Sequence, residues 1–140
     1  MCIRDSFKNE NLQYDDLYPG CLEFFNELKK TKATVAYLTA RKKEQMYDGT
    51  VQVIKDRGLP FNEKLCILKD EDSDDHNYKA NWLKSQMNSF DKIFYFENEA
   101  KIINFVDKSL PSVDIIFMDT IHSGEGESPT HLPILPGRFI

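Results

Sequence analysis

Apolar side chains form short continuous runs in this chain, and these runs alternate with longer stretches in which apolar residues recur at helical spacing. The short runs are typical of strands covered on both faces, and they occupy residues 33–38, 65–68, 92–96 and 113–118. Helical spacing predicts a helix opened by Tyr18-Pro19-Gly20 and further helices over 42–57, 77–88 and 100–108. This order predicts an α/β fold in which a mostly parallel sheet lies between two helical layers.

Polar residues follow two of the predicted strands directly. Thr39-Ala40-Arg41 forms the connection after the first strand, and Glu97-Asn98-Glu99 follows the third. Open α/β sheets build their sites at the carboxyl ends of strands. A hydroxyl there can hold a phosphate oxygen and an acidic cluster can hold a hard divalent cation, so the pattern indicates phosphoryl chemistry.

Each of these residues also has a purely structural interpretation. Thr39 could end its strand by bonding to the local backbone. Glu97 and Glu99 could be acids favoured at a helix start by the helix dipole. Arg41 could orient a substrate or lie in solvent.

Composition narrows the class of protein. The chain has 140 residues, 41% hydrophobic and 29% charged, with a net charge of −5. These values predict one soluble domain over residues 7–121, followed by a Gly- and Pro-rich tail over 122–140 that is loop-like or partly disordered. The acidic balance argues against a nonspecific nucleic-acid binder, and no apolar run approaches the roughly 20 residues that span a bilayer.

Cysteine, histidine and acidic residues give no metal motif of their own. The three cysteines match no zinc or redox spacing, and Cys66 lies in an apolar run that predicts a buried thiol. This favours a reducing, cytoplasmic setting. The acidic run 70–75 lacks the glycine and terminal glutamate of an EF-hand loop, and the three histidines are too scattered for a zinc site.

The first six residues, Met1–Ser6, match the translated end of a common tagmentation adapter. We therefore expect residues 1–6 to be a sequencing artefact and the first strand of the fold to be missing. A genuine N-terminus is the alternative.

Several of these segments together resemble the haloacid-dehalogenase-like (HAD) hydrolase superfamily. Tyr18-Pro19-Gly20 and its helix look like the segment before that family's second motif, and Val35–Arg41 is similar to the second motif itself. Lys92–Glu99 looks like the fourth motif, and Lys79 stands in the place of the third-motif lysine, with Lys69 as a rival. The resemblance implies a three-layer, Rossmann-like α/β/α sheet.

On the substrate side, the resemblance implies a phosphohydrolase that acts through an aspartyl-phosphate. Thr39 would donate its hydroxyl to a phosphoryl oxygen, with Ala40 and Arg41 beside it. Lys79 would place its ammonium on the phosphoryl oxygens. The substrate would be a phosphorylated small molecule. No large cap segment fits between Thr39 and Lys79, and an open site of this kind could also admit a nucleic-acid end.

On the metal side, the resemblance implies a Mg²⁺ ion. Glu97 would hold it directly or through water, with Asn98 or Glu99 in support.

The chain departs from the family pattern in two ways. No apolar strand followed by Asp-x-Asp, which carries the nucleophile, precedes Tyr18. Residues 115–120 resemble that motif superficially but have Ile121 where the second acid belongs, so we interpret them as the terminal strand.

The fourth motif has Glu97 where the family has Asp. The chain as printed is therefore expected to be inactive, and a non-catalytic binding module with this fold is the alternative.

Overall fold

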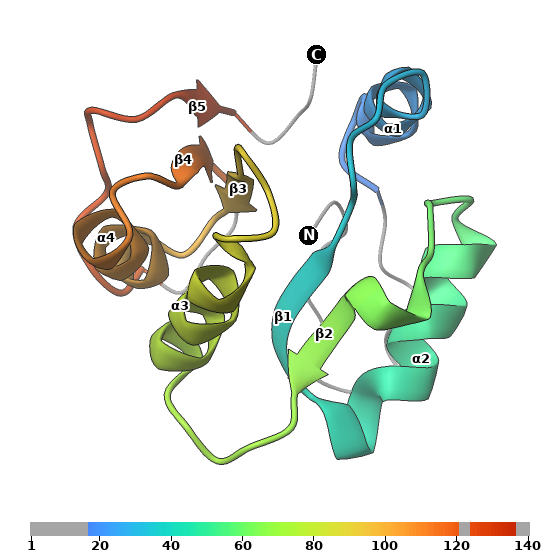
Figure 1. The fold of residues 1–140 in the computed structure, drawn as a ribbon, viewed down its shortest axis with the longest axis horizontal. Coiled ribbons are helices and arrows are strands. Elements are labelled where there is room, and N and C mark those ends of the chain that lie inside the picture. Colours follow the sequence, from blue (N-terminus) through green and yellow to red (C-terminus); the bar gives the residue numbers. More distant parts are fainter. Residues whose placement is uncertain (1–16, 121–123, 137–140) are drawn as a thin grey trace. The chain divides into compact units, whose positions relative to one another are not determined.

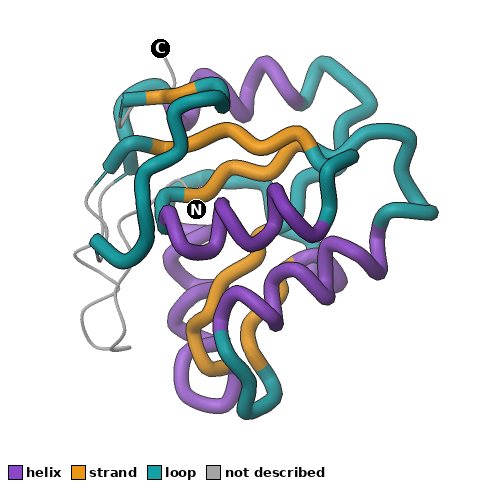
Figure 2. The backbone as a smooth tube through the Cα atoms, turned by 90° about the vertical axis from the view of Figure 1, so that its left-hand side faces the viewer, coloured by secondary structure: helices purple, strands orange, loops and turns teal. Residues whose placement is uncertain are grey.

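The structure is a computed structural model that describes residues 17–120 and 124–136. It is a mixed α/β protein in which strands and helices alternate along the chain, as the purple and orange segments of Figure 2 show. The described residues fall into two compact units, one ending at Asp72 and the other beginning at Ser73. Each unit is described by itself. No helix among the described residues is long and apolar enough to cross a membrane.

The first unit is built around two parallel strands, β1 (Tyr37–Lys42) and β2 (Cys66–Lys69). Helix α2 (Lys43–Asp56) connects them and lies alongside both in Figure 1. Helix α1 (Cys21–Leu28) precedes β1, and a single 3-10 turn, η2 (Glu63–Leu65), precedes β2.

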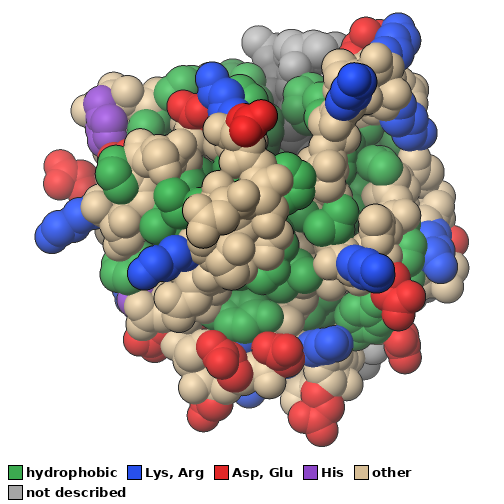
Figure 3. Space-filling view, viewed as in Figure 1, with side chains coloured by type: hydrophobic (Ala, Val, Ile, Leu, Met, Phe, Trp, Pro, Cys, Tyr) green, Lys and Arg blue, Asp and Glu red, His purple; other side chains and the backbone are tan. Residues whose placement is uncertain are grey.

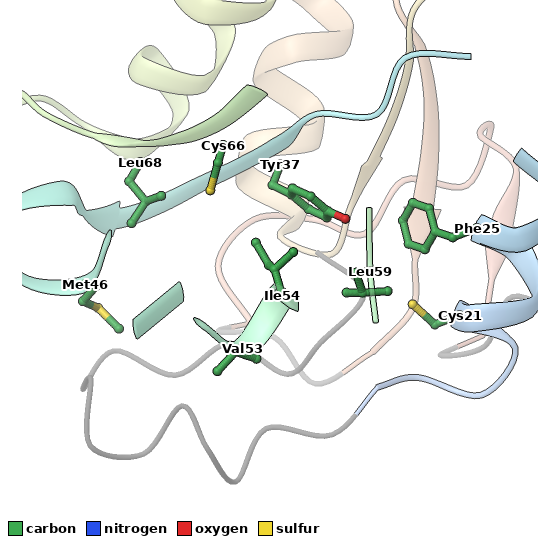
Figure 4. Close-up of a cluster of buried hydrophobic side chains, with 9 residues drawn as sticks. All are labelled: Cys21, Phe25, Tyr37, Met46, Val53, Ile54, Leu59, Cys66 and Leu68. Atoms are coloured by element: carbon green, nitrogen blue, oxygen red, sulfur yellow. The ribbon is translucent and has the colours of Figure 1, made fainter. Parts of the chain in front are cut away.

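The core of this unit joins α1, both strands and α2. Figure 4 shows its nine buried side chains, which point toward one another from these elements. They are Cys21, Phe25, Tyr37, Met46, Val53, Ile54, Leu59, Cys66 and Leu68. The buried thiol predicted for Cys66 is confirmed, since 5% of that residue is exposed.

The end of α2 is fixed by Gly58. Gly58 has φ +73°, a left-handed conformation that costs glycine little. Its N–H donates to Lys55 O at 3.1 Å, and the N–H of Leu59 donates to Ile54 O at 3.1 Å. These two bonds form a Schellman motif, whose usual apolar contact is available from the buried side chains of Leu59 and Ile54.

The second unit contains a three-stranded parallel sheet in the order β3 (Phe94–Glu97), β4 (Asp114–Met118), β5 (Ile134–Leu135). Helix α4 (Ala100–Ser109) connects β3 to β4 and packs on both. Helix α3 (Asp75–Gln86) packs against α4. The buried apolar side chains of the unit come from these helices and strands and from the turn before β4: Ala80, Leu83, Tyr95, Ala100, Ile102, Ile103, Val106, Leu110, Val113, Ile115, Phe117 and Met118.

Residues 124–136, which we call the C-terminal strap, are loop-like as predicted except at Ile134–Leu135, which form strand β5. The strap adds β5 to β4 through bonds from Phe117 N to Pro133 O (2.9 Å) and from Asp119 N to Leu135 O (2.8 Å). Strand 114–118 is therefore not the terminal strand. A two-residue strand beside prolines carries too little periodicity to be predicted from sequence.

The strap also runs along α4. Lys101 N donates to Glu125 O at 3.2 Å, and Asn104 Nδ2 donates to Glu127 O at 2.7 Å. The first of these bonds satisfies one of the amides that a helix leaves open at its N-terminus. The strap is thus bonded both to the sheet and to the helix that packs on it.

Candidate functional site

The first candidate segment, Thr39-Ala40-Arg41, lies inside β1 and does not form the connection after it. Thr39 pairs with Leu68, while Lys42 pairs with Lys69, so Ala40 and Arg41 have no counterparts on β2. The strand begins later than predicted, at Tyr37, because its pairing partner begins at Cys66. Bulges of this kind redirect side chains and are common beside functional sites.

Thr39 is buried, with 4% of its surface exposed. Its Oγ1 accepts a bond from the backbone N–H of Arg41 at 3.3 Å. This is the bond to the local backbone that a purely structural role of Thr39 predicts. Because a hydroxyl that accepts one bond still carries a proton to donate, this bond is compatible with a donor role as well.

Arg41 is 1% exposed, so its interpretation as a solvated side chain was wrong. Its Nη1 donates to Thr50 Oγ1, on α2, at 3.3 Å. The difference arises because Arg41 lies inside β1, where alternation places it on the same buried face as Tyr37 and Thr39. The charge of Arg41 acts on the Cys66 thiol. Burial raises the pKa of this thiol, and the charge of Arg41 opposes the rise without cancelling it.

The second candidate group centres on Lys79, in the first turns of α3. Lys79 is 7% exposed, so a solvated helix lysine is excluded. Its Nζ donates to Glu97 Oε2, at the end of β3, at 2.6 Å. The structure therefore joins two residues that the sequence singled out separately. The rival, Lys69, ends β2 in the other unit.

The Glu97 carboxylate accepts four hydrogen bonds. Lys79 Nζ and Tyr95 Oη both donate to Oε2 at 2.6 Å, while the backbone N–H groups of Asn98 and Glu99 donate to Oε1 at 3.0 and 3.3 Å. Burial raises the pKa of this carboxyl, but the Lys79 charge and the hydrogen bonds outweigh it, and the pKa falls to about 2.

Tyr95 was missed by the sequence analysis. It lies two residues before Glu97 on β3, and side chains two apart on a strand share a face. The alternation of the burial pattern along β3 confirms that both point into the core of the unit. That spacing was the available signal, and it was hidden because tyrosine reads as an ordinary apolar strand residue.

Asn98 and Glu99, the remaining metal candidates, are half-buried at the start of α4. Asn98 Nδ2 donates to Thr120 Oγ1, which follows β4, at 3.1 Å. Thr120 was also missed, since its contact joins two neighbouring strand ends that are 22 residues apart. Glu99 occupies the N-cap position of α4, and its side chain makes no capping bond.

Among residues 17–120 and 124–136, no group of three or more His, Cys, Asp or Glu side chains is placed to hold a metal ion. The acidic side chains of 70–75 are exposed. His76 packs its ring against Phe105, and His131 bonds to Asp107 at 2.7 Å. His122 lies outside the described residues.

On the face seen in Figure 3, basic side chains are dispersed among acidic and hydrophobic ones. Searches of family models, of curated proteins and of solved structures found no match to the chain.

Proposed function

We propose that this chain belongs to the HAD-like class of phosphohydrolases and that its residues bind a phosphoryl group. The observation that carries the proposal is the buried Lys79 ammonium, held by the carboxylate of Glu97 at the last position of a parallel strand. A fixed cation at such a position is suited to an anion, and the mixed α/β order of strands and helices with parallel pairing supports the proposal at the level of fold class.

In the proposed reaction, the substrate is a phosphomonoester. An aspartate carboxylate attacks phosphorus, the bond to the leaving oxygen breaks, and water then cleaves the aspartyl-phosphate. For Lys79 we propose that its ammonium balances the charge on phosphoryl oxygens. For Thr39, in the other unit, we propose that its hydroxyl donates to a phosphoryl oxygen. Positioning and charge stabilisation supply most of the catalysis in such reactions.

Mg²⁺ is the cofactor that the resemblance implies, and its usual role is to bridge the nucleophile and a phosphoryl oxygen. Direct coordination by Glu97 does not fit the structure, because all four acceptor positions of its carboxylate are in use. We therefore derive no step through the metal.

Binding is tested first on the chain as printed, by calorimetric titration with inorganic phosphate. We expect binding that is weakened at least about tenfold in Thr39→Ala and in Lys79→Met, since each loses a bond to a charged ligand. Thr39→Ser, which keeps the hydroxyl, and Lys32→Met, which removes an exposed lysine, are the matched controls. Equal phosphate affinity in all five proteins would contradict the proposal.

Hydrolysis is tested separately, because no apolar strand followed by Asp-x-Asp precedes Tyr18 in this sequence. Reading the source DNA upstream of Phe7 without adapters shows whether such a motif is encoded. A chain that carries it should hydrolyse a generic phosphomonoester. A chain that binds phosphate and has no such motif is the second candidate, a non-catalytic binding module, which the fully bonded Glu97 also favours.

A further inference from the structure

The position of Glu97 in the fourth motif makes it a candidate metal ligand, yet its surroundings are those of a hydrogen-bond acceptor. An ionised carboxylate offers about four lone-pair positions. At Glu97, these are taken by the Lys79 ammonium, the Tyr95 hydroxyl and two backbone N–H groups.

A directly bound Mg²⁺ would have to displace one of these donors. Mg²⁺ requires an oxygen at about 2.0–2.1 Å, and Oε2 already has the Lys79 Nζ at 2.6 Å, so two cations would compete for one oxygen. On Oε1, the ion would leave the N–H of Asn98 or Glu99 without its bond. Both N–H groups are part-buried, and a donor that loses its acceptor away from water is destabilising.

The length of the side chain agrees with an anchoring role. From the last position of β3, the Glu97 carboxylate reaches Lys79 on α3, Tyr95 on its own strand and the amides that follow it. Aspartate is one methylene shorter and could not keep all of these bonds without moving the backbone. The departure from the family's aspartate is then explained by the bonds that glutamate makes.

We propose that Glu97 is the anchor of Lys79, with Tyr95 as its support, and that Glu97 does not coordinate a metal ion directly. Glu97 and Tyr95 are thus positioning residues, which act through the Lys79 ammonium. The anchor itself stands on the contacts above. Its consequence for phosphoryl binding rests on the proposed function.

The test observes the Lys79 ammonium directly by ¹H–¹⁵N correlation spectroscopy of lysine side chains. We expect one ammonium signal protected from water exchange, assigned by its loss in Lys79→Met. Glu97→Gln should abolish the protected signal, whereas Glu99→Gln, the same change two residues away, should leave it. A protected signal that persists in Glu97→Gln would overturn the anchor.

The metal part is tested by titrating MgCl₂ into the same proteins. We expect wild type and Glu97→Gln to respond alike, with dissociation constants within about twofold or with no binding in either. A loss of Mg²⁺ binding of tenfold or more in Glu97→Gln alone would overturn the proposal. Absence of Mg²⁺ and phosphate binding in every protein would count against the proposed function. The role of Glu97 as the anchor of Lys79 would then be decided by the ammonium signal alone.

A variant that keeps the charges balanced covers the case in which Glu97→Gln does not fold. Breaking a buried pair on one side leaves an uncompensated charge, so each single variant should lower the folding equilibrium constant at least about 100-fold. Lys79→Met combined with Glu97→Gln should recover most of that loss. If the loss of stability in the double variant equals the sum of the losses in the two single variants, the two side chains are not paired, and this result would contradict the anchor.

Discussion

Lys79 Nζ and Glu97 Oε2 lie 2.6 Å apart, and the two side chains are only 8% and 6% exposed. The pair ties helix α3 to the last residue of strand β3. A buried ion pair contributes little net stability compared with apolar packing, but it is costly to disrupt from one side. Conditions that remove the charge of Glu97 should therefore destabilise the second unit.

Acid is the simplest such condition. The pKa of Glu97 in the folded protein is about 2, below the ordinary glutamate value of 4.5. Its stabilisation is complete above pH 4.5 and is lost as the pH falls toward 2, because the unfolded state then binds the proton more readily. Urea unfolding between pH 6 and 2.5, followed by the fluorescence of Trp82 on α3, should show this loss.

Glu97→Gln should lack this part of the acid dependence, because it has no carboxyl to protonate. Glu127→Gln removes an exposed carboxyl of the same unit and should unfold with the wild-type pH profile. An acid profile that is the same in Glu97→Gln and in wild type would show that other carboxyls control acid unfolding.

The order of the helices and of strands β1 to β4 was predicted well from the sequence. Candidate site residues could be identified only where they lie at the end of a strand or the start of a helix. Thr39 and Glu97 were identified because each ends an apolar run, and Lys79 because it begins a helix. The bonds of Tyr95 and Thr120 were missed, since they depend on which faces and strand ends meet in space. The burial of Arg41 was missed as well, because the apolar run ends at Leu38 and the polar residues that continue β1 were assigned to the connection after it.

The C-terminal strap offers a matched pair of glycines for measuring its contact with α4. Gly124 and Gly126 have φ +80° and +84°, so alanine at either position pays a similar left-handed penalty of about 1–2 kcal/mol. A Cβ at Gly124 meets nothing within 4 Å, but at Gly126 it lies 2.9 Å from the backbone N of Lys101. We expect Gly126→Ala to be more destabilising by about 1–3 kcal/mol.

Urea unfolding followed through Trp82 measures both strap variants. The difference between their free energies of unfolding cancels the conformational penalty that they share, and so reports the steric contact with Lys101. Asn104→Ala, which loses the bond to Glu127 O at 2.7 Å, should weaken the same attachment by about 1 kcal/mol. Equal stabilities of Gly124→Ala and Gly126→Ala would show that the strap does not lie against α4 in solution.

The thiol of Cys66 should be slow to react in the folded protein. Burial raises its pKa and leaves 5% of the residue exposed, and only the thiolate is nucleophilic. Alkylation with iodoacetamide at pH 7.5, read at this position by peptide mass spectrometry, should be at least about tenfold slower than in denatured protein. Equal rates in both states would contradict the burial of β2.

Thr50 tests whether the hydroxyl bonded to Arg41 matters for the first unit. Thr50 is fully buried on α2, and its Oγ1 accepts from Arg41 Nη1 at 3.3 Å. Thr50→Val keeps the volume but removes the acceptor, which for a bond to a charged group should cost about 1.5–3 kcal/mol. Thr50→Ser keeps the acceptor and loses one methyl, for about 1 kcal/mol. Denaturant unfolding followed by far-UV circular dichroism should therefore rank valine as the more damaging substitution. The opposite order would show that Thr50 contributes through its methyl group and that Arg41 does not depend on it.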